Sequence, residues 1–269
     1  YPVLMPPRPA PAGPKPRGSL NQWKPPKALF HCDADLLDWV LAPLSDNDRA
    51  LFQSVELLPQ APGQKSLYKS LDASLMELAD DIAYGVHDLE DAVVTGTLSV
   101  SQWESHFETV TPELPVSLAT LIEELGEQLF AREHHRRKDA IGALVNIFVT
   151  TVRLEEVLAD ADEPLIRYNA TLPEAETYLL KSLKDVVFEH VINDPAIQQL
   201  RFRSQNMLLD LFSALHTDPL RLLPRNTQQR WRKAMEEQGQ IGADRVLCDY
   251  VAGMTDDYAE RMYRNLFVV

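Results

Sequence analysis

The chain has 269 residues, of which 45% are hydrophobic and 25% charged, and this composition is typical of a folded globular protein. Its formal net charge of −14 argues against general affinity for nucleic acid. The longest stretch without a charged residue runs from Ala140 to Val152. These 13 residues are too few for a membrane-spanning helix, which needs roughly 20. Two cysteines exclude a disulfide framework and favour a reducing compartment, so we expect a cytoplasmic protein.

The N-terminal segment differs from the rest of the chain. Nine of the 19 prolines lie in residues 1–26, where they oppose helix formation and favour polyproline or irregular backbone. Five basic side chains and no acidic one lie in residues 1–32. We therefore expect a proline-rich basic arm over residues 1–33. Because the chain opens on Tyr1 without an initiator methionine, we also expect it to be part of a longer protein.

From Ala34 onward, apolar residues recur at spacings of three and four, and prolines cluster between the apolar segments. This pattern predicts an all-α body, and no segment requires a strand. The expected helices cover residues 34–42, 46–57, 71–96, 100–109, 115–134, 137–159, 174–193, 196–216, 227–237, 240–252 and 255–265.

The predicted helix over 71–96 has two contrasting faces. At about 100° per residue, its chemically active side chains fall on one stripe, and its large apolar side chains fall on the opposite one. The polar stripe holds Glu77, Asp80, Tyr84, His87, Asp88 and Asp91. The pattern alone favours a solvated acidic face. A metal and substrate face is the alternative, because hard divalent cations prefer carboxylate oxygens.

Two long motifs resemble a known family. Met76–Tyr84 (MELADDIAY), continued by Asp88–Ala92 (DLEDA), closely resembles the signature of bacterial deoxyguanosinetriphosphate triphosphohydrolases, which are members of the HD-domain superfamily. Cys248–Ala259 (CDYVAGMTDDYA) resembles the C-terminal motif of the same family. The resemblance spans about residues 70–265. It implies an HD-domain-type helical bundle with a C-terminal helical extension.

This resemblance also implies a domain plan. After the arm at 1–33, we expect the C-terminal part of the HD-domain core, including the helix with the late metal ligand, over residues 34–110. A C-terminal helical region would then cover residues 111–269.

The resemblance assigns roles to individual residues. Members of the family hold a divalent metal, Mg or Mn, through a histidine, a His-Asp pair and a later aspartate, and they split a dNTP into deoxynucleoside and inorganic triphosphate. By position in the motif, Asp80 matches the later aspartate. Tyr84 matches the tyrosine that packs against the substrate sugar, and Asp88 matches the aspartate that binds the 3′-hydroxyl. The motif residues Asp81 and Asp91 receive no ligand role.

The remaining ligands should precede Asp80, but the dipeptide His87-Asp88 follows it. We therefore expect this chain to be the part after the histidine and His-Asp ligands, with no catalytic residue of its own assigned. The family binds the triphosphate through lysine, tyrosine and arginine, and by position the candidates here are Tyr1, Lys27 and Arg245. For Lys27, a solvated side chain on the arm is an equally good interpretation.

The expected function is metal-dependent hydrolysis of a dNTP, with dGTP indicated by the family's name. The resemblance further implies a homo-oligomer, a hexamer, and in some members a single-stranded DNA effector, which here would need a local basic patch such as residues 132–138 or the N-terminal arm. Because the upstream ligands are absent, a non-catalytic helical regulatory or assembly subunit is the alternative. A third option is an HD-superfamily phosphohydrolase that acts on a different nucleotide.

Overall fold

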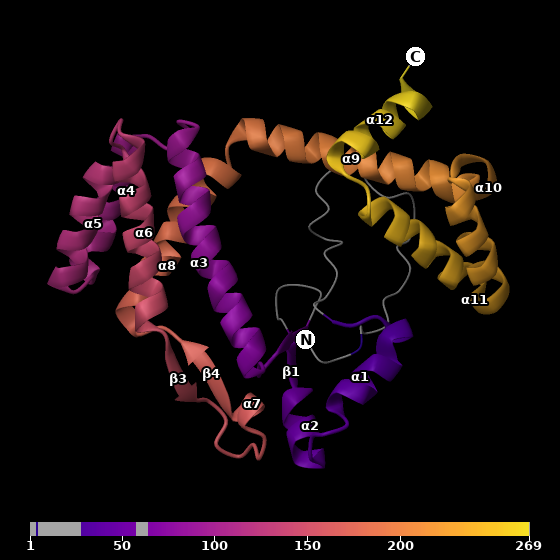
Figure 1. The fold of residues 1–269 in the computed structure, drawn as a ribbon, viewed down its shortest axis with the longest axis horizontal. Coiled ribbons are helices and arrows are strands. Elements are labelled where there is room, and N and C mark those ends of the chain that lie inside the picture. The colour runs from indigo at the N-terminus through magenta and orange to yellow at the C-terminus, as the bar shows by residue number, and fades with distance from the viewer. Residues whose placement is uncertain (1–3, 5–27, 58–63, 269) are drawn as a thin grey trace. The chain divides into compact units, whose positions relative to one another are not determined.

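The computed structural model describes Leu4, residues 28–57 and residues 64–268, and these residues are mostly helical (Figure 1). The prediction of an all-α protein is confirmed. The chain divides into two compact units, one with the described residues up to Asp194 and one with those from Pro195 onward. None of the helices in the described part of the chain is both long enough and apolar enough to cross a membrane.

The first unit contains most of the helices. Their bounds are α1 (Ala34–Leu41), α2 (Asp46–Phe52), α3 (Leu71–Val94), α4 (Val100–Val110), α5 (Val116–Leu129), α6 (His134–Thr151), α7 (Pro164–Arg167) and α8 (Glu174–Val187). A π-helical turn, Phe188–Ile192, follows α8. Several helices begin at a capping side chain: Ser70 Oγ accepts the backbone N–H of Ala73 at 3.2 Å at the start of α3, and Ser99 forms a capping box with Gln102 at the start of α4.

Helix α3 is the centre of the first unit. It packs against α8 and α6 (Figure 1), and it also contacts α7 and β4. Most of its apolar stripe is buried, as the sequence pattern predicts, with Val86 and Leu89 fully inaccessible to solvent, although Leu75 near its start is exposed. This burial leaves the opposite stripe of α3 for polar side chains.

Two short antiparallel hairpins correct the prediction that no strand is needed. Strands β1 (Val55–Leu57) and β2 (Gln64–Ser66) form one, and β3 (Arg153–Glu156) and β4 (Tyr168–Thr171) form the other. The helices expected over 46–57 and 137–159 therefore end earlier.

The early end of α6 has a local and a distant cause. Thr151 is its last residue, and Val152 adopts an extended ψ of 134°, in a β-branched stretch that lowers helix propensity. The decisive partner is distant, because Arg153 pairs with Thr171 and Glu156 with Tyr168. A pattern of local apolar spacing does not report such pairing.

The second unit consists of α9 (Pro195–Thr217), α10 (Pro219–Leu222), α11 (Arg225–Ala252) and α12 (Asp256–Phe267). Its core includes Leu215, Leu223 and Leu247, all buried. Gly239 interrupts α11 with a φ of 68°, a conformation that glycine adopts at little cost. The break predicted between helices 227–237 and 240–252 is confirmed at this glycine.

Candidate functional site

The candidate site is the polar stripe of α3. Asp80 is exposed, whereas Tyr84 and Asp88, one and two turns further along the helix, are half-buried. We call the stripe formed by Glu77, Asp80, Asp81, Tyr84 and Asp88 the α3 polar face. The structure thus places the metal-ligand candidate and the two sugar-binding candidates on one helix face, in the order that the motif predicts.

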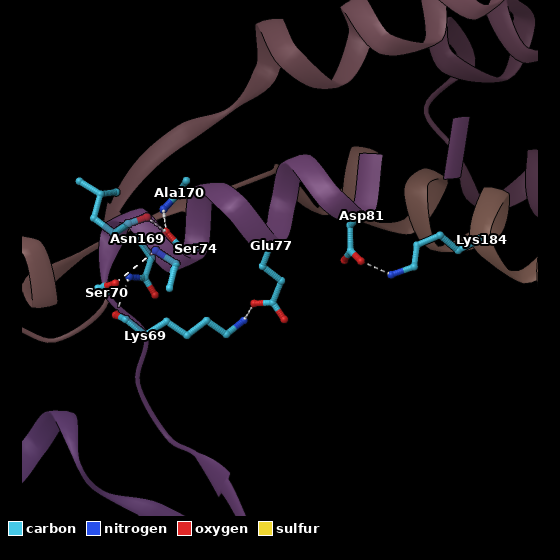
Figure 2. A network of polar contacts seen from close by, with 10 residues as sticks. Lys69, Ser70, Ser74, Glu77, Asp81, Asn169, Ala170 and Lys184 are labelled. Atoms are coloured by element: carbon cyan, nitrogen blue, oxygen red, sulfur yellow. Dashed lines mark hydrogen bonds and ion pairs between the residues drawn. The ribbon is translucent and has the colours of Figure 1, made fainter. Parts of the chain in front are cut away.

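A lysine from α8 lies across this face. Lys184 Nζ donates a hydrogen bond to Asp81 Oδ1 at 2.5 Å and lies 5.8 Å from the centroid of the Tyr84 ring. Figure 2 shows the Lys184 side chain directed toward Asp81. The sequence analysis missed Lys184, because it lies 103 residues after Asp81 and no motif marks it.

A glycine sets the close approach of α8. A Cβ atom added at Gly85 would lie 3.0 Å from Leu180 Cδ1 and 3.4 Å from Lys184 Cγ. The absence of a side chain at this buried position lets the stem of Lys184 pass close to the α3 backbone at Gly85. Tight packing of the two helices therefore fixes where the ammonium group can reach.

Burial, together with neighbouring negative charges, shifts the pKa values of two groups on this face. The pKa of Tyr84 is raised, first by burial and then by the negative charges of Asp88 and Asp185. The positive charge of Lys184 acts to lower it. Burial and the neighbouring Asp91 raise the pKa of Asp88, and His87 acts in the opposite direction. The carboxylates of this face offer oxygen atoms that can accept hydrogen bonds or contact a cation, which makes the face suited to a metal ion and a substrate hydroxyl.

The start of α3 is fixed by the β3–β4 hairpin (Figure 2). Ser74 Oγ accepts the backbone N–H of Ala170 at 2.9 Å, and Asn169 Nδ2 donates to the backbone carbonyl of Lys69 at 3.1 Å. The Lys69 side chain in turn forms an ion pair with Glu77. These contacts hold the N-terminal half of α3 in place and give Glu77 a structural partner.

An open cavity of about 1220 Å³ adjoins this half of α3. The residues that line it are mostly apolar, among them Leu37 and Phe52. The polar lining residues include Tyr68 and Lys69, which precede α3, and Glu77 and Asp80 on α3. A cavity that is largely apolar with a few polar groups is typical of small-molecule sites. Asp80 therefore lines a space large enough for a nucleotide, whereas Tyr84 and Asp88 are not among the residues that line it.

The structure does not test the three predicted phosphate-binding residues against the α3 polar face. Tyr1 and Lys27 lie outside the described residues. Arg245 belongs to α11 in the second unit, where it is exposed and its Nε donates to Asp249 Oδ1 at 2.8 Å. The phosphate-binding role of all three stays a prediction.

The donor chemistry of Asp80 fits a hard divalent cation, because an exposed carboxylate offers oxygen ligands. Within the part of the chain that the structure describes, no group of three or more His, Cys, Asp or Glu side chains is placed to hold a metal ion. The role of Asp80 as one of several metal ligands stays a prediction.

Comparison with known proteins identifies relatives of this chain. Residues 170–265 match the phosphohydrolase-associated domain family. A deoxyguanosinetriphosphate triphosphohydrolase-like protein of Shewanella sp. (strain ANA-3) is 49% identical over 253 residues, which cover 92% of this chain and 55% of the relative. The chain is a homologue of the deoxyguanosinetriphosphate triphosphohydrolase-like proteins.

Two further relatives carry the same name. That of Actinobacillus succinogenes is 47% identical, with 93% of this chain and 55% of the relative covered, and that of Histophilus somni is 45% identical, with 92% and 54% covered. The resemblance inferred from the two motifs is confirmed. The chain spans about half the length of these curated relatives.

Proposed function

We propose that this chain supplies a metal ligand and the deoxynucleoside-binding face of a metal-dependent dNTP triphosphohydrolase. The supporting observation is that the homologues named deoxyguanosinetriphosphate triphosphohydrolase-like share 45–49% identity with this chain. Its helix α3 presents Asp80, Tyr84 and Asp88 in motif order, and Asp80 lines a nucleotide-sized cavity. Cytoplasmic location, a hexamer and a single-stranded DNA effector belong to the same proposal.

Each residue of the face has a distinct task in this proposal. Asp80 offers one carboxylate to Mg or Mn, and the bound ion supplies polarisation of a phosphoryl oxygen and orientation of water. Tyr84 presents its ring to the deoxyribose. Asp88 accepts a hydrogen bond from the 3′-hydroxyl, which fixes the sugar and hence the direction of the phosphate chain. The triphosphate would be contacted by Tyr1, Lys27 and Arg245.

A kinetic comparison of three variants tests the proposal in the protein that contains this chain. Release of inorganic triphosphate from each of the four dNTPs is measured with Mg and with Mn. Asp80→Ala should abolish release, because a ligand of the metal is lost. Asp88→Ala should raise KM by roughly 10-fold or more, since a hydrogen bond to a charged group is removed. Asp72→Ala, at an exposed position in the first turn of α3, is the control and should leave both constants unchanged.

Unchanged hydrolysis by Asp80→Ala would contradict the proposed ligand role. A wild-type protein that self-associates but releases triphosphate from none of the four dNTPs would favour the alternative, a non-catalytic regulatory or assembly subunit of the same fold, provided that it hydrolyses no other nucleotide either.

A further inference from the structure

We propose that Lys184 is a positioning residue, which holds the Tyr84 ring in the orientation that packs against the deoxyribose. This inference rests on the proposed function and extends it to a residue on α8 that lies outside the signature motif. Because the inference concerns sugar binding, loss of Lys184 should change KM more than kcat.

The position of the Lys184 ammonium is determined from two sides. On one side, Asp81 accepts its hydrogen bond at 2.5 Å. Asp81 and Tyr84 are three residues apart on α3 and so are neighbours on its surface. An ammonium held at Asp81 therefore also lies near the Tyr84 ring, and its distance of 5.8 Å from the centroid is within the range of a cation–π contact.

The stem of Lys184 is fixed as well. Its Cγ would be 3.4 Å from a Cβ at Gly85, and its side chain is 31% exposed, so the aliphatic part packs against α3 while the charged end reaches Asp81. The side chain of a lysine that formed only a surface ion pair could rotate away from its partner. Here the stem, the carboxylate and the aromatic ring together restrict it.

The charge balance around Tyr84 gives Lys184 a specific importance. The negative charges of Asp88 and Asp185 act to raise the pKa of Tyr84, and the positive charge of Lys184 acts to lower it. Without the ammonium, the ring loses its cation–π contact and remains beside these two negative charges. We expect it to sample orientations that do not present its face to a sugar.

The first test compares Lys184→Met, Lys184→Arg and Lys181→Met with the wild type, by KM and kcat for dGTP and by thermal midpoint. Lys184→Met keeps an unbranched stem but removes the charge, and it should raise KM about fivefold with kcat within about twofold. Lys184→Arg preserves the ion pair and the cation–π contact and should restore most of the affinity. Lys181 is exposed one turn earlier on α8, so its variant should match the wild type.

The second test is a double-mutant cycle with Tyr84→Leu. If Lys184 acts through the ring, then adding Lys184→Met to Tyr84→Leu should raise KM no further, whereas independent effects multiply. Multiplicative effects, or an unchanged KM in Lys184→Met while the wild type is active, would overturn this inference alone. A wild type that hydrolyses no dNTP would overturn it together with the proposed function. If Lys184 had only a structural role, Lys184→Met would lower the thermal midpoint, and its effect on KM would multiply with that of Tyr84→Leu.

Discussion

Asp48 shows at the scale of a single residue how the first unit is held together. Its side chain is 1% exposed, and its two oxygens accept the backbone N–H groups of Asp162 at 3.0 Å and Glu163 at 2.9 Å. Because hydrogen bonds to a buried charge are strong and their loss leaves N–H groups unpaired, Asp48→Ala should lower the free energy of unfolding by about 2–4 kcal/mol. Urea denaturation followed by circular dichroism measures this. Asp46→Ala, at an exposed position on the same helix, should cost less than about 1 kcal/mol, and equal losses would contradict the argument.

Asp88 gives a prediction about pH. Its pKa in the folded protein is raised above 3.8, first by burial and then by Asp91. The folded state thus binds the proton more tightly than the unfolded state, so the wild type gains stability as the pH falls through the raised pKa. Asp88→Asn removes this ionisation and should be more stable than the wild type at neutral pH, with the difference vanishing below 3.8. Urea denaturation of both proteins across this range checks the sign, and a difference that grows on acidification would contradict it.

At the scale of the element, two helical glycines make opposite predictions. A Cβ at Gly126 on α5 would lie 2.7 Å from Nε1 of Trp103, which is buried, whereas a Cβ at Gly142 on α6 would meet nothing within 4 Å. Gly126→Ala should therefore destabilise the protein by about 1–3 kcal/mol through overpacking. Gly142→Ala should stabilise it by roughly 0.5–1 kcal/mol, because alanine restricts the unfolded chain and favours helix. Thermal unfolding distinguishes the two, and shifts of the same sign would refute the packing argument.

The elements also show how far sequence reasoning extends. Periodicity predicts both faces of α3, because burial of Val86 and Leu89 and exposure of Asp80 follow from a 3.6-residue repeat. The break predicted between 227–237 and 240–252 falls at Gly239, whose positive φ interrupts α11. The β3–β4 hairpin and the contact of Lys184 with Asp81 depend on partners far along the chain, and local periodicity carries no information about such partners.

At the scale of the whole molecule, the match to the phosphohydrolase-associated domain crosses the boundary between the two units. It begins at residue 170, inside β4, and ends at residue 265, in α12. The matched segment therefore includes α8, which packs on α3 within the first unit. If Lys184 positions Tyr84, then α8 is the element through which this segment acts on the substrate face.

The net charge of −14 leads to a prediction for the whole chain. Self-repulsion among like charges weakens the compact state, so raising NaCl from about 10 to 300 mM should increase the thermal midpoint by a few degrees through screening. MgCl₂ at the same ionic strength should give the same increase in the 269-residue chain. A single exposed carboxylate such as Asp80 binds magnesium weakly, and the described residues hold no group of three or more His, Cys, Asp or Glu side chains placed around a metal ion. Differential scanning fluorimetry of the wild type and Asp80→Asn in both salts measures the difference. An additional increase in MgCl₂ that Asp80→Asn abolishes would contradict this expectation and show that the chain binds the ion through Asp80 without further ligands.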